Sequence, residues 1–395
     1  MSDRGPPGGD PFGGIPFFGE LMRMLAGAGR PGPDTARQLA RSLANDGEWE
    51  PNVEPTDRIA IEELMRVAEL HVAEATGLST GHGSTGRAEV GNRAQWADRT
   101  IDDYGPLFEQ LGGSLAAGMQ APIDVPDDDP MAAMLAGLGQ MMGPMMSSMT
   151  TGSLVGHLAR RSLGGYDLPV PRPPEKPLLV LLRNVDEFGA RWSLDADDLR
   201  LWVCLHEMTH QLVFSVPHVR DRLTDLLSRH AGGFETNPRM IEERFGDLDL
   251  SAGPEALAEL QASLGDPDTI LGAVRSPVQD ALQPELTALV AAISGYVDHT
   301  MDEIGSKLIG SYPMLTEALR RRRVEADASD RFVERVLGLE LDRAQYERGA
   351  AFAAGVVDRA GGEGLRRLFA PPANLPTPAE VAAPGLWLAR IELDS

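Results

Sequence analysis

The sequence is poor in cysteine, in aromatic residues and in positive charge, and two of these shortages exclude whole classes of protein. A single cysteine, Cys204, among 395 residues rules out an intramolecular disulfide bond. This suits a reducing compartment, and we expect the protein in the cytoplasm. Lysine and arginine total 36 against 59 aspartates and glutamates, for a net charge of −23. So acidic a chain argues against general nucleic-acid binding.

The sequence also lacks long hydrophobic runs. No stretch of about 18 or more residues is uninterruptedly apolar, so we expect no membrane span. Residues 1–16 lack the basic start and apolar centre of a signal peptide, and their glycine and proline content predicts a flexible terminus. Hydrophobic residues still make up 42% of the chain, which is enough for a sizeable core.

The most informative motif is His206-Glu207-Met208-Thr209-His210. Residues four apart lie on one face of a helix, so both imidazoles can bind one metal ion. Glu207 lies beside the pair, where it can take a proton from a metal-bound water. This H-E-x-x-H arrangement is typical of zinc hydrolases. It predicts His206 and His210 as ligands of Zn²⁺ and Glu207 as the catalytic base.

The segment around the motif is apolar on almost every side, which predicts a buried helix over residues 196–214. Asp195 can cap its N-terminus, Asp197 suits the first turn, and Pro217 marks its end. Buried histidines and a buried glutamate need partners, because unpaired polar groups are costly there. A metal ion satisfies them together, and hydrogen bonds to carbonyls or carboxylates are the alternative. We interpret Cys204, on another helix face, as a small buried hydrophobe.

Helical patterns dominate the rest of the chain. They predict a mainly α, multi-helical fold with a few short strands, one of them the apolar run 178–182. We expect a flexible stretch at 1–16, an N-terminal helical region at 17–170 and a region at 171–395 that carries the motif. The last two regions are alternatively one continuous domain.

Two further clusters do not predict a site. Seven methionines gather between residues 131 and 149. An adaptable binding surface and a soft copper site are alternatives, but the spacing suits helix faces and favours packing. Four consecutive arginines at 320–323 share a helical stretch with Glu317 and Glu325. This pattern predicts an exposed, ion-paired face rather than a binding patch.

Several segments resemble a known family. They are residues 165–169, the motif with Leu201–Leu205 before it, and residues 215–217, with similar stretches at 11–19 and 337–341. Over nearly its whole length the chain resembles a zincin-like family common in actinobacteria. Members are named as hydrolases or metallopeptidases, and some are linked to deazaflavin-cofactor biosynthesis. The resemblance implies a zincin-like core, a zinc cofactor, and a strand beside the active-site helix that can bind extended substrate.

The resemblance also bears on the third metal ligand, which catalytic zinc usually takes from elsewhere in the fold. In the family a later helix carries a Glu-Gly pair and, one turn on, an acid. In gluzincins such a Glu is the third ligand and such an Asp orients a ligating histidine. Here Ser294 replaces the Glu and Asp298 is the acid. Because a serine hydroxyl is a weak zinc ligand, Asp298 becomes either the third ligand or a supporting residue. The alternative ligands are His299, Asp302 and Glu303.

A second zincin pattern, that of the metzincins, has a glycine and a third histidine after the motif. Val213 and Val216 stand at those two positions, which excludes the pattern. His218 lies beyond the helix-breaking Pro217, and we do not expect it to bind the metal.

Two functions of different class fit these features. The first is a zinc-dependent metallopeptidase or related amide hydrolase acting on a peptide or protein, with water activated by zinc and Glu207. The second is a catalytically degenerate zincin-fold scaffold or binding protein, which Ser294 favours. The retained Glu207 favours the enzyme, because a scaffold has little use for a carboxylate beside two histidines. The single cysteine excludes the commonest structural zinc sites. The sequence does not determine the oligomeric state.

Overall fold

The computed structural model describes residues 33–45, 50–79, 87–119, 147–235, 275–325 and 328–393. The flexible terminus expected at 1–16 lies outside these ranges, as does all but the end of the methionine-rich stretch.

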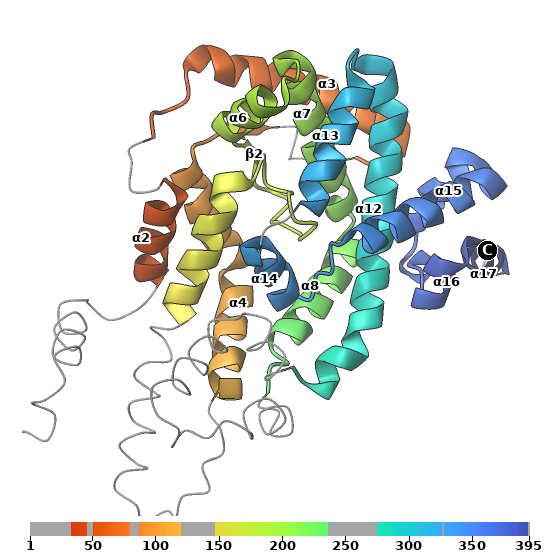
Figure 1. Cartoon of the computed structure of the whole chain (residues 1–395). Coiled ribbons are helices and arrows are strands. Elements are labelled where there is room, and N and C mark those ends of the chain that lie inside the picture. Colours follow the sequence, from red (N-terminus) through yellow and green to blue (C-terminus); the bar gives the residue numbers. More distant parts are fainter. Residues whose placement is uncertain are drawn as a thin grey trace, which may run out of the picture.

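The described residues form a mainly α fold with one small sheet, which confirms the predicted fold class (Figure 1). Residues 147–161 are helical as well. The named elements are α2 (Pro33–Ala44), α3 (Pro55–Thr76), β1 (Ala88–Val90), α4 (Arg93–Met119), β2 (Leu178–Val180), α6 (Leu182–Trp192), α7 (Ala196–Ser215), α8 (Pro217–Ala231), α12 (Pro277–Leu308), α13 (Tyr312–Val324), α14 (Ala328–Val336), α15 (Arg343–Arg366), the 3-10 turns η2 (Arg367–Phe369) and η3 (Pro372–Asn374), α16 (Pro378–Ala382) and α17 (Pro384–Leu393).

The longest described helix, α12, organises the core. It packs against α15, α7, α8 and α3, and Figure 1 shows it running the height of the molecule. Its N-terminus has a capping box, in which Ser276 and Gln279 satisfy each other's backbone N–H groups. Residues 286–297 of this helix are buried without interruption. A helix that is apolar all round has to be enclosed by others, and α12 is.

A close crossing joins α12 to α15. A Cβ atom added to Gly295 would lie 2.0 Å from the carbonyl oxygen of Gly349. Only residues without a side chain allow two helix backbones to approach this closely. The crossing brings the first turns of α15 beside the part of α12 that carries Ser294 and Asp298.

The small sheet supports the start of the motif helix. β2 pairs in parallel with β1, with Leu179 opposite Glu89. Its other edge is bridged in antiparallel sense by Gly164. The strand ends at Val180, two residues earlier than expected, because Leu182 already begins α6. In the described part of the chain both edges of β2 are therefore occupied beside α7, so it offers no edge for an extended substrate.

The two ends of helix α7 (Ala196–Ser215) follow from its sequence. The Asp195 carboxylate accepts hydrogen bonds from the backbone N–H groups of Asp197 and Asp198, at 3.1 and 2.9 Å. The helix ends at Ser215, and Pro217 opens α8. Nearly every residue from Leu199 onward is buried, because α3, α6, α8, α12 and β2 surround the helix. Within the described ranges, every helix is too short or too polar to cross a bilayer.

Candidate metal centre

His206 and His210 lie one turn apart on α7 with their ring centroids 4.4 Å apart. Their exposed fractions are only 8% and 4%. Trp202 stacks on the His206 ring at 4.9 Å, and Tyr166 stacks on the His210 ring at 5.6 Å. These two stacks hold both imidazoles in fixed planes. The helix spacing thus produces the side-by-side pair that the motif predicts.

Both imidazoles are in the form that binds metals. The Nδ1 atom of His210 lies 3.1 Å from the carbonyl oxygen of His206. A carbonyl only accepts hydrogen bonds, so Nδ1 carries the proton and Nε2 keeps its lone pair. Burial, followed by the charge of Arg323, lowers the pKa of His206 to about 3. Burial and the neighbouring His206 hold the pKa of His210 well below its usual value. Both rings are therefore neutral at pH 7.

A small cavity adjoins the pair. Its volume is about 20 Å³. That is room for roughly one water molecule or one metal ion. The residues that line it come from α7, α12, α13, α15 and the loop before β2, namely Tyr166, Asp167, Pro169, His206, His210, Ser294, Val297, Asp298, Arg323 and Tyr346.

Two carboxylates line this cavity, and each is paired with an arginine of α13. Asp298 accepts hydrogen bonds from Nη1 of Arg323 on both of its oxygens, at 2.7 and 2.9 Å. Asp167 is paired with Arg322. Burial raises the pKa of Asp167, but the Arg322 charge outweighs it and the pKa is lowered. Among the described residues, no three His, Cys, Asp or Glu side chains are close enough together to hold a metal ion.

The other residues considered as ligands lie in four places. Ser294 lines the small cavity and is 6% exposed. His299 and Asp302 line a larger neighbouring groove instead. Glu303 forms an ion pair with Lys307 at 3.4 Å. His218 lies in the first turn of α8. The structure thus brings Ser294 and Asp298 to the histidine pair. The three alternative ligands, and His218, lie outside the described lining of the cavity.

Glu207 is fully enclosed next to the pair, with 1% of its surface exposed. One of its oxygens accepts the N–H of Gly165 at 2.7 Å, and both accept that of Tyr166 at 3.1 Å. Burial, and after it the charge of Asp167, raises the pKa of Glu207 to about 8, although the hydrogen bonds from Tyr166 and Gly165 lower it. The carboxylate faces the loop and is not among the described residues that line the cavity.

The loop that holds Glu207 was not predicted as part of the site. A Cβ atom at Gly164 would lie 2.4 Å from the carboxyl carbon of Glu207. Trp96 donates its Nε1–H to the Gly164 carbonyl, and Arg172 donates Nε–H to the Gly165 carbonyl, both at 2.7 Å. The adjacent glycines were a usable signal, because a glycine pair allows a backbone to approach a buried side chain.

The arginine run was predicted as an exposed face, and for two of its members this is wrong. All four arginines are ion-paired, as expected. Arg322 and Arg323, however, have side chains only 16% and 18% exposed and reach the carboxylates beside the histidine pair. Consecutive residues of a helix point in different directions, so one run serves both the surface and the site.

The donor set fits a metal ion held by the two histidines. Two neutral, fixed imidazoles, a cavity of ion size and a carboxylate in its wall match the chemistry of a zinc site with histidine and carboxylate ligands. The Asp298 carboxylate is the candidate oxygen donor in that wall. It has to move toward the histidine pair to bind the same ion, because no three such side chains of the described residues are close enough together.

Comparison with known proteins gives one family and one related fold. Residues 33–388 match the family model described as zincin-like metallopeptidase. A crystal structure from Chloroflexus aurantiacus, described as a proposed hydrolase with a novel fold, has a TM-score of 0.63 and 24% sequence identity. That match covers 91% of this chain and 98% of the other. Among curated proteins, none matches the chain.

Proposed function

The chain belongs to the zincin-like metallopeptidase family, and from this premise we propose that it is a zinc-dependent metallopeptidase or related amide hydrolase. The observation that carries the proposal is the pair of buried, neutral imidazoles of His206 and His210 beside a cavity of ion size. When bound there, zinc supplies Lewis acidity that activates a water and polarises a carbonyl group.

Glu207 is the proposed base. Its carboxylate accepts a proton from the attacking water and passes it to the leaving nitrogen. Burial raises the pKa of this carboxyl above that of an ordinary glutamate, which makes the carboxylate a stronger base. To reach the water, the carboxylate turns away from at least one of the N–H groups of Gly165 and Tyr166 that hold it.

Asp298 is the proposed third ligand. A carboxylate offers about four lone-pair positions, and Arg323 occupies two of those on Asp298. The remaining positions can bind a metal while the ion pair persists, once Asp298 and the histidine pair have moved closer together. Arg323 then orients the carboxylate, as residues that contact metal ligands commonly do.

One observation favours the second function, a non-catalytic zincin-fold scaffold. Both oxygens of Glu207 are engaged by backbone N–H groups, and Ser294 supplies no carboxylate where the resemblance implies one. In that function the histidine pair and Glu207 serve only to join α7 to the loop at 164–166.

Elemental analysis of the purified protein tests the site. We expect about one zinc per chain, lost in His206→Ala and kept in His218→Ala, whose histidine lies outside the cavity. Peptide cleavage, abolished in Glu207→Ala while zinc is retained, would then support the hydrolase. A folded wild type that takes up no zinc would contradict the proposal and favour the scaffold.

A further inference from the structure

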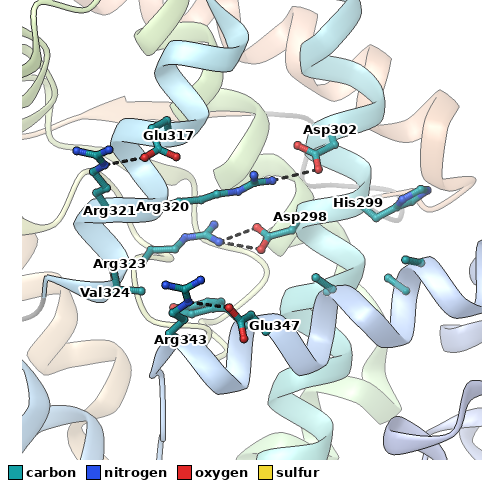
Figure 2. Close-up of a pocket in the computed structure, with 15 residues that line it drawn as sticks. Asp298, His299, Asp302, Glu317, Arg320, Arg321, Arg323, Val324, Arg343 and Glu347 are labelled. Atoms are coloured by element: carbon teal, nitrogen blue, oxygen red, sulfur yellow. Dashed lines mark hydrogen bonds and ion pairs between the residues drawn. The ribbon is translucent and has the colours of Figure 1, made fainter.

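The small cavity opens beside a much larger groove of about 660 Å³. Figure 2 shows its walls, formed by α12, α13 and α15. Part of its surface is a strip of small residues, Gly295 of α12 and Ala350, Ala353 and Ala354 of α15. Charged side chains of both signs surround this strip of small residues. Most of them are paired with one another, as Arg321 is with Glu317. The groove has the size of a binding site for a small organic molecule or a short peptide end.

The groove and the small cavity share one wall. Asp298, Arg323 and Tyr346 line both spaces. A ligand in the groove therefore meets the ion pair of Arg323 with Asp298 (Figure 2). The same two residues line the small cavity together with His206 and His210. The strand route is closed, because β1 and Gly164 occupy the two edges of β2. The groove is thus an open space that shares a wall with the site.

Arg323 has donor capacity to spare at this wall. Only Nη1 is engaged by Asp298, and the Tyr346 ring lies 5.1 Å from the guanidinium carbon. Among the described residues, the N–H groups on Nε and Nη2 have no hydrogen-bond partner. Those two groups form one edge of the guanidinium, which matches the two oxygens of a carboxylate. The side chain is 18% exposed, so this pairing would be partly shielded from water.

We propose that the groove binds the carboxyl terminus of a peptide, with its carboxylate held by the Nε and Nη2 edge of Arg323. This inference rests on the proposed function and specifies its substrate class. With the terminal carboxylate bound by Arg323, the amide bond next to that carboxylate is the one that lies closest to His206 and His210. The strip of small residues suits a peptide whose terminal side chain is small. The protein is strongly acidic, so binding of an anion requires a local positive group such as this one.

Calorimetric titration of the metal-free protein tests the proposal. The probes are N-acetyl-alanyl-alanine, its carboxyl-terminal amide, and N-acetyl-alanyl-glutamate with an amidated terminus, whose only carboxylate is in the side chain. We expect the free acid to bind about tenfold or more tighter than either amide, since a charge-assisted pair contributes on this scale. Equal affinity for acid and amide, or no binding of any probe, would overturn the proposal. So would an equal preference for the glutamate side chain.

Two variants assign the effect to Arg323. Arg323→Met is expected to bind the free acid no better than the amide, and Arg323→Lys to recover only part of the preference because it lacks the two-pronged edge. Arg200→Met is the matched control. Arg200 is also 18% exposed and paired with an aspartate, Asp186, at 3.0 Å, but lies outside the groove. A loss of preference in this control equal to that in Arg323→Met would assign the effect to net charge and overturn the proposal.

The outcome is separable from that of the proposed function. Zinc content is measured on the wild type without peptide, and peptide binding is measured without zinc. Acid and amide binding equally to a protein that takes up zinc would overturn the groove proposal alone. A clear carboxylate preference in a protein that never binds zinc would contradict the hydrolase alone.

Discussion

The Glu207 carboxylate leaves no room for a side chain at Gly164. The added Cβ atom of an alanine there would lie 2.4 Å from the carboxyl carbon. Either the loop or the carboxylate has to move, although both are held by hydrogen bonds.

We expect Gly164→Ala to lower the free energy of unfolding by about 2 kcal/mol, the scale of overpacking in a core. Any peptide cleavage would be lost with it, because Glu207 would be displaced. Urea denaturation measures the first effect. The control is Gly113→Ala in α4, where an added Cβ meets no atom within 4 Å and helix propensity predicts a small gain of up to about 1 kcal/mol. Equal free energies of unfolding for the two variants would contradict this prediction, since they would mean that the loop moves at little cost.

His230 is a second residue whose environment has a measurable consequence. It is 4% exposed, its Nδ1 atom lacks a partner among the described residues, and its ring meets Phe234 edge-on. Burial, and after it the charge of Arg275, lowers the pKa of His230 to about 4. Between this value and the ordinary 6.5 the unfolded chain binds more protons than the folded one. Stability therefore falls as the pH drops through that window.

We expect the unfolding free energy of the wild type to fall more than that of His230→Gln between pH 7 and pH 4. The difference should approach about 3 kcal/mol, since one pKa unit corresponds to about 1.4 kcal/mol. Urea denaturation at several pH values measures it. Parallel stability profiles for the two proteins would mean that His230 is protonated without cost in the folded state. His206 contributes a similar fall to both proteins and cancels in the comparison.

At the scale of elements, α7 depends on its N-terminal cap. Asp195 accepts two backbone N–H groups that have no partner within the helix. Asp195→Ala should cost about 1 kcal/mol of stability. Asp197→Ala removes a first-turn charge without removing the cap and should cost less. Thermal denaturation of the two variants ranks them, and a larger loss for Asp197→Ala would contradict the capping geometry.

The crossing of α12 and α15 is the element contact that shapes the groove. Gly295 and Gly349 let the two backbones touch, and Tyr346 and the alanines of α15 line the same groove as Asp298 of α12. A wider crossing would separate the wall formed by Asp298, Arg323 and Tyr346, and the two spaces would no longer share it.

At the scale of the whole molecule, the site exists only in the folded chain. One hydrophobic core joins residues from α2 through α17. The walls of the small cavity come from α7, α12, α13, α15 and the loop before β2. An ion that binds this assembly and not the unfolded chain stabilises the protein by mass action.

Added zinc should therefore raise the thermal midpoint of the wild type. At a free concentration about 100 times the dissociation constant, the gain is about 2.7 kcal/mol. A chelator should reverse the shift, and His206→Ala should show none. Differential scanning calorimetry measures all three. A shift of equal size in His206→Ala would mean that zinc binds somewhere other than the histidine pair.

Several features followed from local sequence signals. Asp195, the apolar run after it and Pro217 predicted helix α7 almost to the residue. The four-residue spacing of His206 and His210 placed both rings on one face, because helix geometry is the same in every fold. Strand β2 was predicted at the right place but too long, since a short apolar run does not show where a strand gives way to a helix.

The rest was decided by tertiary structure. The spacing of the motif carried no information on what meets Glu207, which proved to be the backbone of residues 165 and 166. It also could not show that Arg323 reaches Asp298, because 25 residues separate them in sequence. The sequence by itself determined the helices and the histidine pair, which depend on neighbours in the chain. Only the packed fold decided which charges surround that pair, because ion pairs and cavities form between segments that the chain order leaves far apart.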